Sequence, residues 1–276
     1  MLRFLSGFAS VVLLVGCSKG PCPRGQELRE VKYPSQAIKE RGCMGKDSDG
    51  NYRLQGKWEF YYEDGQKSAE VTYKNGNAAG ERGNTGILRD GRDGPFRMWH
   101  PNGQKEQEAT FVDGKEDGVT RAWHPNGQKA SEGTYVAGKK QGAWITWHPN
   151  GQKEWEGAYR DGTLSGVATK WHPNGQKEQD STFVDGKENG VFVRWHENGQ
   201  KASEGTFVDG TLSGVATKWH PNGQQESEVI SFVDGTPSGV VTEWHPNGQK
   251  SLESTYKAGA LISEKRWDKN GKALER

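Results

Sequence analysis

The chain has 276 residues, a formal net charge of +1 and a mean hydropathy of −0.96. Without an excess of basic residues it cannot displace many counterions from phosphates, which argues against nucleic acid as a main partner. Its 39 glycines and 11 tryptophans, in a chain poor in aliphatic residues, predict a turn-rich protein that packs aromatic rings and has no thick globular core.

Residues 1–16 are expected to be an export signal. Arg3 provides a positive charge, and the apolar run from Leu5 to Val15 is too short to span a bilayer permanently. The small residue Gly16 precedes Cys17 in a pattern that resembles the lipobox of bacterial lipoproteins, whose cysteine thiol takes a diacylglycerol. An ordinary secretory signal with a chance cysteine is the alternative. Ser18, rather than an aspartate, favours a lipid anchor in the outer membrane of a Gram-negative bacterium.

Residues 17–55 show no repeat and are expected to form a tether and an N-terminal cap. They hold the remaining cysteines, Cys22 and Cys43. In an exported protein such a pair indicates a disulfide, which would stabilise the fold by roughly 3 kcal/mol. Two free thiols are an alternative. A metal site is another, although no histidine lies nearby.

From residue 56 to residue 276 the chain is repetitive. A Trp-His-Pro-Asn-Gly run, or a close variant, recurs every 24 residues between Trp99 and Trp219, and the next step is 25 residues. A fixed period of this size is the signature of a repeat array of roughly nine units. The tryptophans that open these runs are Trp99, Trp123, Trp147, Trp171, Trp195, Trp219 and Trp244.

Each repeat is predicted to be a β-hairpin. In one copy the strands are expected at residues 119–124 and 128–136, joined by the turn residues Pro125, Asn126 and Gly127. Proline fixes φ, asparagine tolerates the next position, and glycine accepts a positive φ, which suits a three-residue loop with a glycine bulge. Ala137-Gly138 begins a second turn, where other copies have Asp-Gly. The array should therefore be an all-β, open, elongated, single-layer antiparallel meander.

The expected pairing places Trp123 opposite Lys129 and Val119 opposite Gly133. Because side chains alternate along a strand, Trp123 and Tyr135 would then share one face with a small residue between them. We infer that this small position makes room for a neighbouring ring, and that each lysine stem lies on the indole opposite it, a contact worth ~0.5–1 kcal/mol. The small positions are Ala109, Gly133, Gly157, Ser181 and Gly205, and the lysines are Lys105, Lys129, Lys153, Lys177, Lys201 and Lys250.

This pattern resembles the MORN repeat, and more closely the short bacterial variant of the YwqK-like family, whose members are commonly described as antitoxins of toxin–antitoxin systems. The motif here is Gly118-x4-Trp123-x3-Gly127-x7-Tyr135-x2-Gly138-x3-Gly142. One departure is that Trp-His replaces the more usual Tyr-Tyr. The resemblance implies an open β-sheet. It implies little about function, because such repeats serve as scaffolds in many contexts.

Two segments interrupt or end the array. Residues 81–94 add 14 residues to the usual spacing, and their glycine content predicts a surface loop. Residues 261–276 are rich in charge and are expected to form a C-terminal cap, since charged residues on a terminal strand oppose edge-to-edge association.

The titratable residues do not predict a catalytic or metal site. The seven histidines occupy one repeat position, and equivalent residues two strands apart lie roughly 9–10 Å from one another, too far to share a zinc ion. We expect each histidine to bond locally at its turn. The acids that follow the same period, such as Glu108 and Glu132, are expected to be solvated. We therefore expect no enzyme, metal or cofactor.

The row of seven tryptophans is the candidate binding stripe, since exposed aromatic rows mark interaction sites. The alternative is that these rings only stack on one another and on lysine. Our first hypothesis is a membrane-anchored scaffold that binds a protein partner, with an antitoxin or immunity role implied by the resemblance. A second hypothesis is a cell-envelope protein that stacks polysaccharide rings on the tryptophans.

Overall fold

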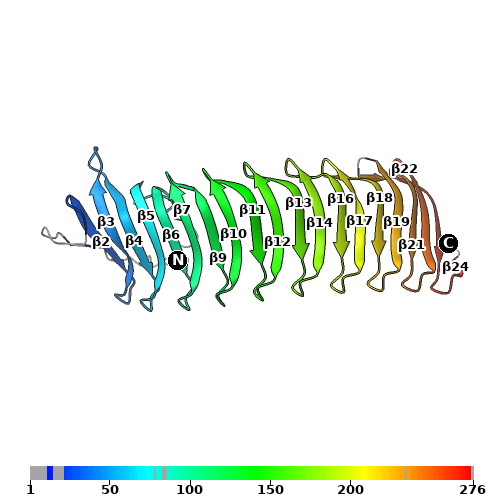
Figure 1. Cartoon of the computed structure of the whole chain (residues 1–276), viewed down its shortest axis with the longest axis horizontal. Coiled ribbons are helices and arrows are strands. Elements are labelled where there is room, and N and C mark those ends of the chain that lie inside the picture. The colour runs from blue at the N-terminus through cyan, green and yellow to red at the C-terminus, as the bar shows by residue number, and fades with distance from the viewer. Residues whose placement is uncertain (1–10, 15–21, 78, 83–85, 234, 275–276) are drawn as a thin grey trace, which may run out of the picture. The chain divides into compact units, whose positions relative to one another are not determined.

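The computed structural model describes residues 11–14, 22–77, 79–82, 86–233 and 235–274. It confirms the predicted fold class: these residues form strands and turns, with no helix among them. The chain divides into two compact units, Met1–Lys140 and Gln141–Arg276. Within each unit, the two strands of each hairpin lie side by side and pair antiparallel, as β6 does with β7 and β13 with β14 (Figure 1). None of the described residues forms a helix long and apolar enough to cross a membrane.

The first unit begins with strand β1, which pairs with β2 and covers four residues of the expected signal segment. The rest of residues 1–16, together with Cys17, lies outside the described residues. The strands of this unit are β1 (Val11–Leu14), β2 (Gln26–Lys32), β3 (Ile38–Lys46), β4 (Tyr52–Tyr61), β5 (Lys67–Asn77), β6 (Arg92–Trp99), β7 (Lys105–Val112), β8 (Lys115–Glu116), β9 (Gly118–Trp123) and β10 (Lys129–Val136).

The second unit continues the same succession of hairpins, and β11 begins at the boundary between the units. Its strands are β11 (Lys139–Trp147), β12 (Lys153–Arg160), β13 (Thr163–Trp171), β14 (Lys177–Val184), β15 (Lys187–Glu188), β16 (Gly190–Trp195), β17 (Lys201–Val208), β18 (Thr211–Trp219), β19 (Gln225–Val233), β20 (Thr236–Pro237), β21 (Gly239–Trp244), β22 (Lys250–Lys257), β23 (Ala260–Trp267) and β24 (Ala273–Leu274).

Both predicted turns are present. At the first turn, the His124 N–H donates to the Gln128 carbonyl and the Gly127 N–H donates to the His124 carbonyl, each at 2.8 Å. Gly127 has a φ of 83°, as a glycine bulge requires. At the second turn, Asp113 and Gly114 have φ values of 47° and 78°. Two consecutive positive φ angles define a type I′ turn, whose twist suits a two-residue hairpin loop.

The predicted pairing is correct at the turn and wrong beyond it. Lys129 pairs with Trp123, but the next pair is Ser131 with Ala122, because Ala130 forms a bulge. A one-residue slip moves every later side chain to the other face of the sheet. The tryptophan and the second aromatic residue of a repeat therefore lie on opposite faces, not on a shared one. The same shift follows the tryptophan in the hairpins that pair β6 with β7, β11 with β12, β13 with β14, β16 with β17 and β21 with β22.

The two faces of the sheet therefore differ in chemistry. We call them the ring face and the charged face. In the copy built from β9 and β10, the ring face carries Thr120, Ala122, Ser131, Gly133 and Tyr135. The charged face of the same copy carries Val119, Arg121, Trp123, Glu132 and Thr134.

Large and small side chains are matched across the ring face. Phe192 pairs with Gly205, and a Cβ atom placed on Gly205 would lie 2.8 Å from the Phe192 ring. Trp144 pairs with Gly157, where an added Cβ atom would lie 2.7 Å from the Trp155 ring. The inference that the small position makes room for a ring is therefore confirmed. Because the packing is close, a larger side chain at the small position would clash with the ring beside it.

The insertion after β5 does not behave as the predicted surface loop. Ile87 and Leu88 are only 2% and 3% exposed, and they belong to the apolar cluster that holds Trp58, Val71 and Tyr73. The sheet alone would leave these large apolar side chains of the ring face in water, and the insertion covers them. The first unit therefore has a real core, which composition alone did not predict.

Residues 22–46 also contribute a hairpin of the repeat type. The Tyr33 N–H donates to the Ala37 carbonyl and the Gln36 N–H donates to the Tyr33 carbonyl, both at 2.9 Å, as in a Trp-His-Pro-Asn-Gly turn. The sequence hides this copy because Gln36, with a φ of 70°, stands where the other turns have glycine. Cys22 and Cys43 form a disulfide that ties the start of this segment to β3, with their Cα atoms 5.6 Å apart.

Candidate functional site

Within each unit, the tryptophans of the predicted stripe lie on the charged face, but their rings are not fully exposed. All seven tryptophans of the stripe are half-buried. The Lys105 ammonium lies 5.3 Å from the ring centroid of Trp123, and the Lys153 ammonium lies 5.5 Å from that of Trp171. These lysines thus cover the indole of the next copy, not the one paired with them in the same hairpin as predicted. Further lysine–tryptophan contacts of this kind join Lys67 to Trp99, Lys177 to Trp195, Lys201 to Trp219 and Lys250 to Trp267.

The same lysines hold the periodic acids of the charged face. Lys105 lies 3.0 Å from Glu108, and Arg121 bridges Glu108 at 3.2 Å and Glu132 at 2.8 Å. The hydrogen bond from Lys105, followed by the one from Arg121, lowers the pKa of Glu108, and Lys129 and Arg121 lower that of Glu132. Carboxylates held ionised in this way are poor proton donors, so Glu108 and Glu132 are poor candidates for a general acid.

The histidines connect neighbouring copies. His100 Nε2 lies 2.8 Å from the Trp123 carbonyl oxygen, and His148 Nε2 lies 2.9 Å from that of Trp171. We expected bonds within the turn, but these bonds reach the next copy. The equivalent bonds join His172 to Trp195, His196 to Trp219, His220 to Trp244 and His245 to Trp267. Across the described part of the chain, no group of three or more histidine, cysteine or acidic residues could hold a metal ion.

Tyrosine takes the place of histidine in the first copies. The Tyr33 hydroxyl donates to the Tyr61 carbonyl at 2.9 Å, and the Tyr62 hydroxyl donates to the Trp99 carbonyl at 2.7 Å. The Trp-His and Tyr-Tyr forms of the motif therefore make the same bond between copies. This equivalence accounts for the departure from the usual motif noted in the sequence.

The turn asparagines extend this connection. Asn102 Nδ2 donates to the Pro125 carbonyl at 2.6 Å, and Asn150 Nδ2 donates to the Pro173 carbonyl at the same distance. Asn102 Oδ1 also accepts the Gln104 N–H at 3.1 Å, which fixes the turn itself. The repeated sequence is thus explained mainly by contacts between adjacent hairpins.

The fold and these contacts define a class of protein, an array of stacked β-hairpin repeats in open antiparallel sheets. Six stretches of the chain match the family model for the MORN repeat variant, which supports a MORN-type repeat protein. The matched stretches are residues 54–75, 92–113, 116–137, 164–185, 188–209 and 237–258.

A comparison with curated proteins found no match. Among solved structures, a chain from the crystal structure of TcdB2-TccC3-Cdc42 is similar at 10% sequence identity and a TM-score of 0.18. The alignment covers 90% of this chain and 13% of that one, so the present chain spans a small part of its length. The description of the fold therefore rests on the strand pairings given above.

One cavity was missed by the sequence analysis. It has a volume of about 380 Å³ and lies on the ring face of the first unit. Its walls include Tyr33, Phe60, Tyr62, Ile87 and Glu106. The tyrosines at the histidine position are a sequence signal for this cavity. The insertion that supplies Ile87 gives no such signal, because its glycine content predicts a surface loop.

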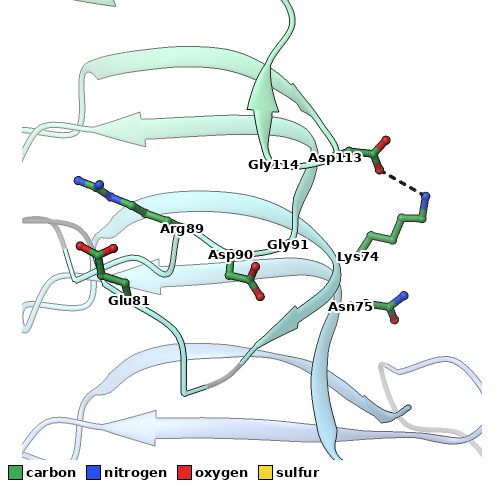
Figure 2. Close-up of a pocket in the computed structure, with 8 residues that line it drawn as sticks. All are labelled: Lys74, Asn75, Glu81, Arg89, Asp90, Gly91, Asp113 and Gly114. Carbon is green, nitrogen blue, oxygen red and sulfur yellow. Dashed lines mark ion pairs between the residues drawn. The ribbon is translucent and has the colours of Figure 1, made fainter. Parts of the chain in front are cut away.

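A second hollow of about 480 Å³ lies where β5, the insertion and the turn after β7 meet (Figure 2). The Lys74 ammonium lies 3.5 Å from Asp93 and 3.9 Å from Asp113, the second of which is the dashed contact in Figure 2. Asp90 accepts the Asn77 N–H at 2.7 Å. These carboxylates therefore fasten the insertion and turn to the sheet.

Proposed function

We propose that the protein is a non-enzymatic repeat scaffold whose second unit binds a protein partner on its ring face. Repeats of the MORN type often serve protein or membrane binding, which supports the proposal at the level of the family. The specific support comes from the insertion of the first unit, because it provides an example of a polypeptide segment bound on this face.

The insertion binds the ring face through both side chains and backbone. The Leu88 carbonyl accepts a bond of 3.0 Å from the Tyr73 hydroxyl and one of 2.9 Å from Arg92 Nε. Arg82 donates two bonds, of 2.9 and 3.1 Å, to Glu40. A segment that presents two adjacent aliphatic residues and one arginine is therefore a good ligand for this surface.

The second unit presents the same type of face without such a segment in its described residues, 141–233 and 235–274. Several of its aromatic and aliphatic side chains there are half-buried, so a partner would remove further apolar surface from water. The half-buried side chains in question are Leu164, Phe183, Phe207, Leu212 and Tyr256.

A photocrosslinking experiment would test this assignment. A benzophenone amino acid is placed at Leu164 or Leu212 on the ring face, and at Val167 or Val191 as controls. Both control valines lie on the charged face and are 62% and 61% exposed. A protein captured only from the ring-face positions supports the proposal. Capture from the valines alone would assign binding to the other face.

The glycan hypothesis finds less support, since the lysine of the preceding copy covers most of the indoles that a sugar ring would need. It still makes a distinct prediction. The chain would be retained on purified cell-wall polysaccharide, and changing Trp147 and Trp171 to alanine in a folded chain would abolish retention. An intact interaction in that double variant would leave the tryptophan row with a purely structural role.

A lipid anchor at Cys17 is part of the proposal and rests on the sequence. Metabolic labelling with a fatty acid, followed by mass spectrometry of the N-terminal peptide, should find the lipid on the parent chain. Cys17→Ala should lack it. An immunity role would require a toxin that acts in the cell envelope, because an exported protein cannot neutralise a cytosolic one.

A further inference from the structure

The cavity on the ring face of the first unit has the dimensions of a small-molecule site. Its volume of about 380 Å³ lies within the usual range for ligand pockets. Several elements build it. The turn after β2 supplies Tyr33, β4 and the residue after it supply Phe60 and Tyr62, the insertion supplies Ile87, and β7 supplies Glu106.

The aromatic walls are held in place. The Tyr33 hydroxyl is bound to the Tyr61 carbonyl and the Tyr62 hydroxyl to the Trp99 carbonyl. Because these backbone bonds occupy the hydroxyls, the rings are what remain for contact with a ligand. Ring faces carry a negative quadrupole and attract cations. Two contacts nearby show this preference: the Lys39 ammonium lies 5.6 Å from the Tyr33 ring, and the Arg41 guanidinium lies 5.4 Å from the Tyr61 ring.

The cavity also contains a carboxylate that is not neutralised. Glu40 is 4% exposed and is paired with Arg82, whereas Glu106 forms no ion pair among the residues that the structure describes. Lys39 is the one lysine or arginine among the residues that line the cavity, and His100, whose ring is bonded to the Trp123 carbonyl, is the one histidine. The next turn adds two exposed acids, Glu63 and Asp64.

The raised pKa values of Tyr33 and Tyr62 indicate the same negative potential. Burial raises the pKa of Tyr33, and the charges of Glu63, Asp64 and Glu40 raise it further. Burial likewise raises the pKa of Tyr62, with Glu106 and Asp64 adding to it. Both phenols are therefore neutral at physiological pH, and acids dominate the field around them.

We propose that this cavity binds an organic cation, an alkylammonium or guanidinium group on an apolar stem. Phe60 and Tyr62 would contact the cation and its stem, and Glu106 would pair with the charge, because the Tyr33 ring is already covered by Lys39. The inference does not depend on the partner proposed for the second unit.

Titration calorimetry on the full chain tests it with matched probes. Pentylamine, protonated at neutral pH, and Nα-acetylarginine amide carry the two forms of cation, and 1-pentanol is the neutral counterpart. We expect both cations, or one of them, to bind at least about tenfold more tightly than 1-pentanol. Glu106→Gln should weaken cation binding about tenfold. Glu226→Gln changes the equivalent position of another repeat in the second unit, far along the chain from this cavity, and should leave binding unchanged.

Each outcome is informative. Binding of the arginine amide alone would identify the ligand as a basic side chain of a polypeptide, and binding of pentylamine would identify it as a free amine. Equal binding of 1-pentanol would mean that the cavity is only apolar and would overturn the proposal. Absence of any binding, or unchanged affinity in a folded Glu106→Gln chain, would overturn it as well.

Discussion

Gly127 has two separate reasons to be glycine. Its φ of 83° lies in the left-handed region, and a Cβ atom there would overlap the Oε1 atom of Gln104 from the preceding copy. Gly65 occupies the same turn position with a φ of 85° and has no atom within 4 Å of the corresponding Cβ position. Gly65 is therefore required for its backbone conformation alone, whereas Gly127 is required both for its backbone conformation and for the contact with the preceding copy.

Alanine substitutions at Gly65 and Gly127 should separate the free-energy cost of backbone strain from that of the contact between copies. Gly65→Ala should lower the free energy of unfolding by about 1 kcal/mol, because L-residues disfavour this φ. Gly127→Ala should cost more, because the Gln104 side chain must also move. In a Gln104→Ala background the two costs should become equal, which urea denaturation would measure. If Gly65→Ala were neutral, the strain argument would be wrong.

Glu59 predicts a pH dependence at the charged face. Burial alone would raise its pKa, but hydrogen bonds from Lys67, Tyr61 and Arg41 outweigh burial and hold the pKa well below its usual range. An acid whose pKa is lowered by folding stabilises the fold above its unfolded pKa, near 4.3, and loses that contribution as the pH falls towards the folded pKa.

Glu59→Gln should therefore destabilise the first unit by about 1 kcal/mol at pH 7, after allowance for solvent screening. The difference from the parent should shrink steadily below pH 4. Denaturation curves at pH 7, 5 and 3 would measure it. A difference that is constant over this range would indicate that packing, and not charge, explains the effect.

At the scale of the element, the bond between copies requires a hydrogen-bond donor at the end of each first strand. His148 supplies it to Trp171, and Tyr62 supplies the same bond to Trp99. His148→Tyr should therefore keep the bond and most of the stability, whereas His148→Phe should lose about 1 kcal/mol because the Trp171 carbonyl loses its partner. Thermal unfolding of the two variants gives the comparison. Equal losses would show that ring shape, and not the donor, decides the position.

One copy lacks the lysine that covers the next indole. Gln225 occupies the lysine position. Glu228 occupies the position of the acid that pairs with this lysine in other copies, and Trp244 is the tryptophan of the next copy. Gln225→Lys should restore both the ion pair and the contact with the ring, and raise stability by roughly 0.5–1 kcal/mol. The gain should fall in high salt. Lys201→Gln, which removes contacts to Glu204 and Trp219, is the converse variant and should lose a similar amount.

The hairpins could be predicted from the sequence because their turn residues have specific backbone requirements. Proline, asparagine and glycine at residues 125–127 determine the loop, and a period of 24 residues repeats it. The faces could not be predicted, because Ala130 forms its bulge without any compositional signal, and one extra residue exchanges the two faces. The hairpin turn at Tyr33 was missed for a similar reason, since Gln36 adopts a positive φ that few non-glycine residues accept.

The cavity depends on contacts between segments that are distant in the chain. Ile87 belongs to a glycine-rich stretch that reads as a loop, and its burial follows only from the large apolar side chains that the first hairpins present, such as Trp58. A sequence shows that Ile87 is apolar but not which surface it covers. The turns could be predicted because they depend on neighbouring residues. The cavity could not, because it depends on tertiary contacts between distant segments.

At the scale of the whole molecule, stability in a repeat array is a sum of contacts between neighbours, so damage should stay local. The Cys22–Cys43 disulfide offers the clearest test, because it links the segment just before β2 to β3 in the first unit. Its removal should loosen β2 and β3 while leaving the hairpins of the second unit unchanged.

Hydrogen exchange on the Cys22→Ala, Cys43→Ala double variant would measure this. We expect amide protection in β2 and β3 to fall by about tenfold or more, since a disulfide closing this loop contributes roughly 3 kcal/mol. Protection in β13 and β14 should match the parent within error, and these strands serve as the internal control. An equal loss of protection in β13 and β14 would instead mean that the array unfolds as one cooperative body. The nearest-neighbour description would then fail, and the free-energy changes expected for single copies would depend on the cooperativity of the whole chain.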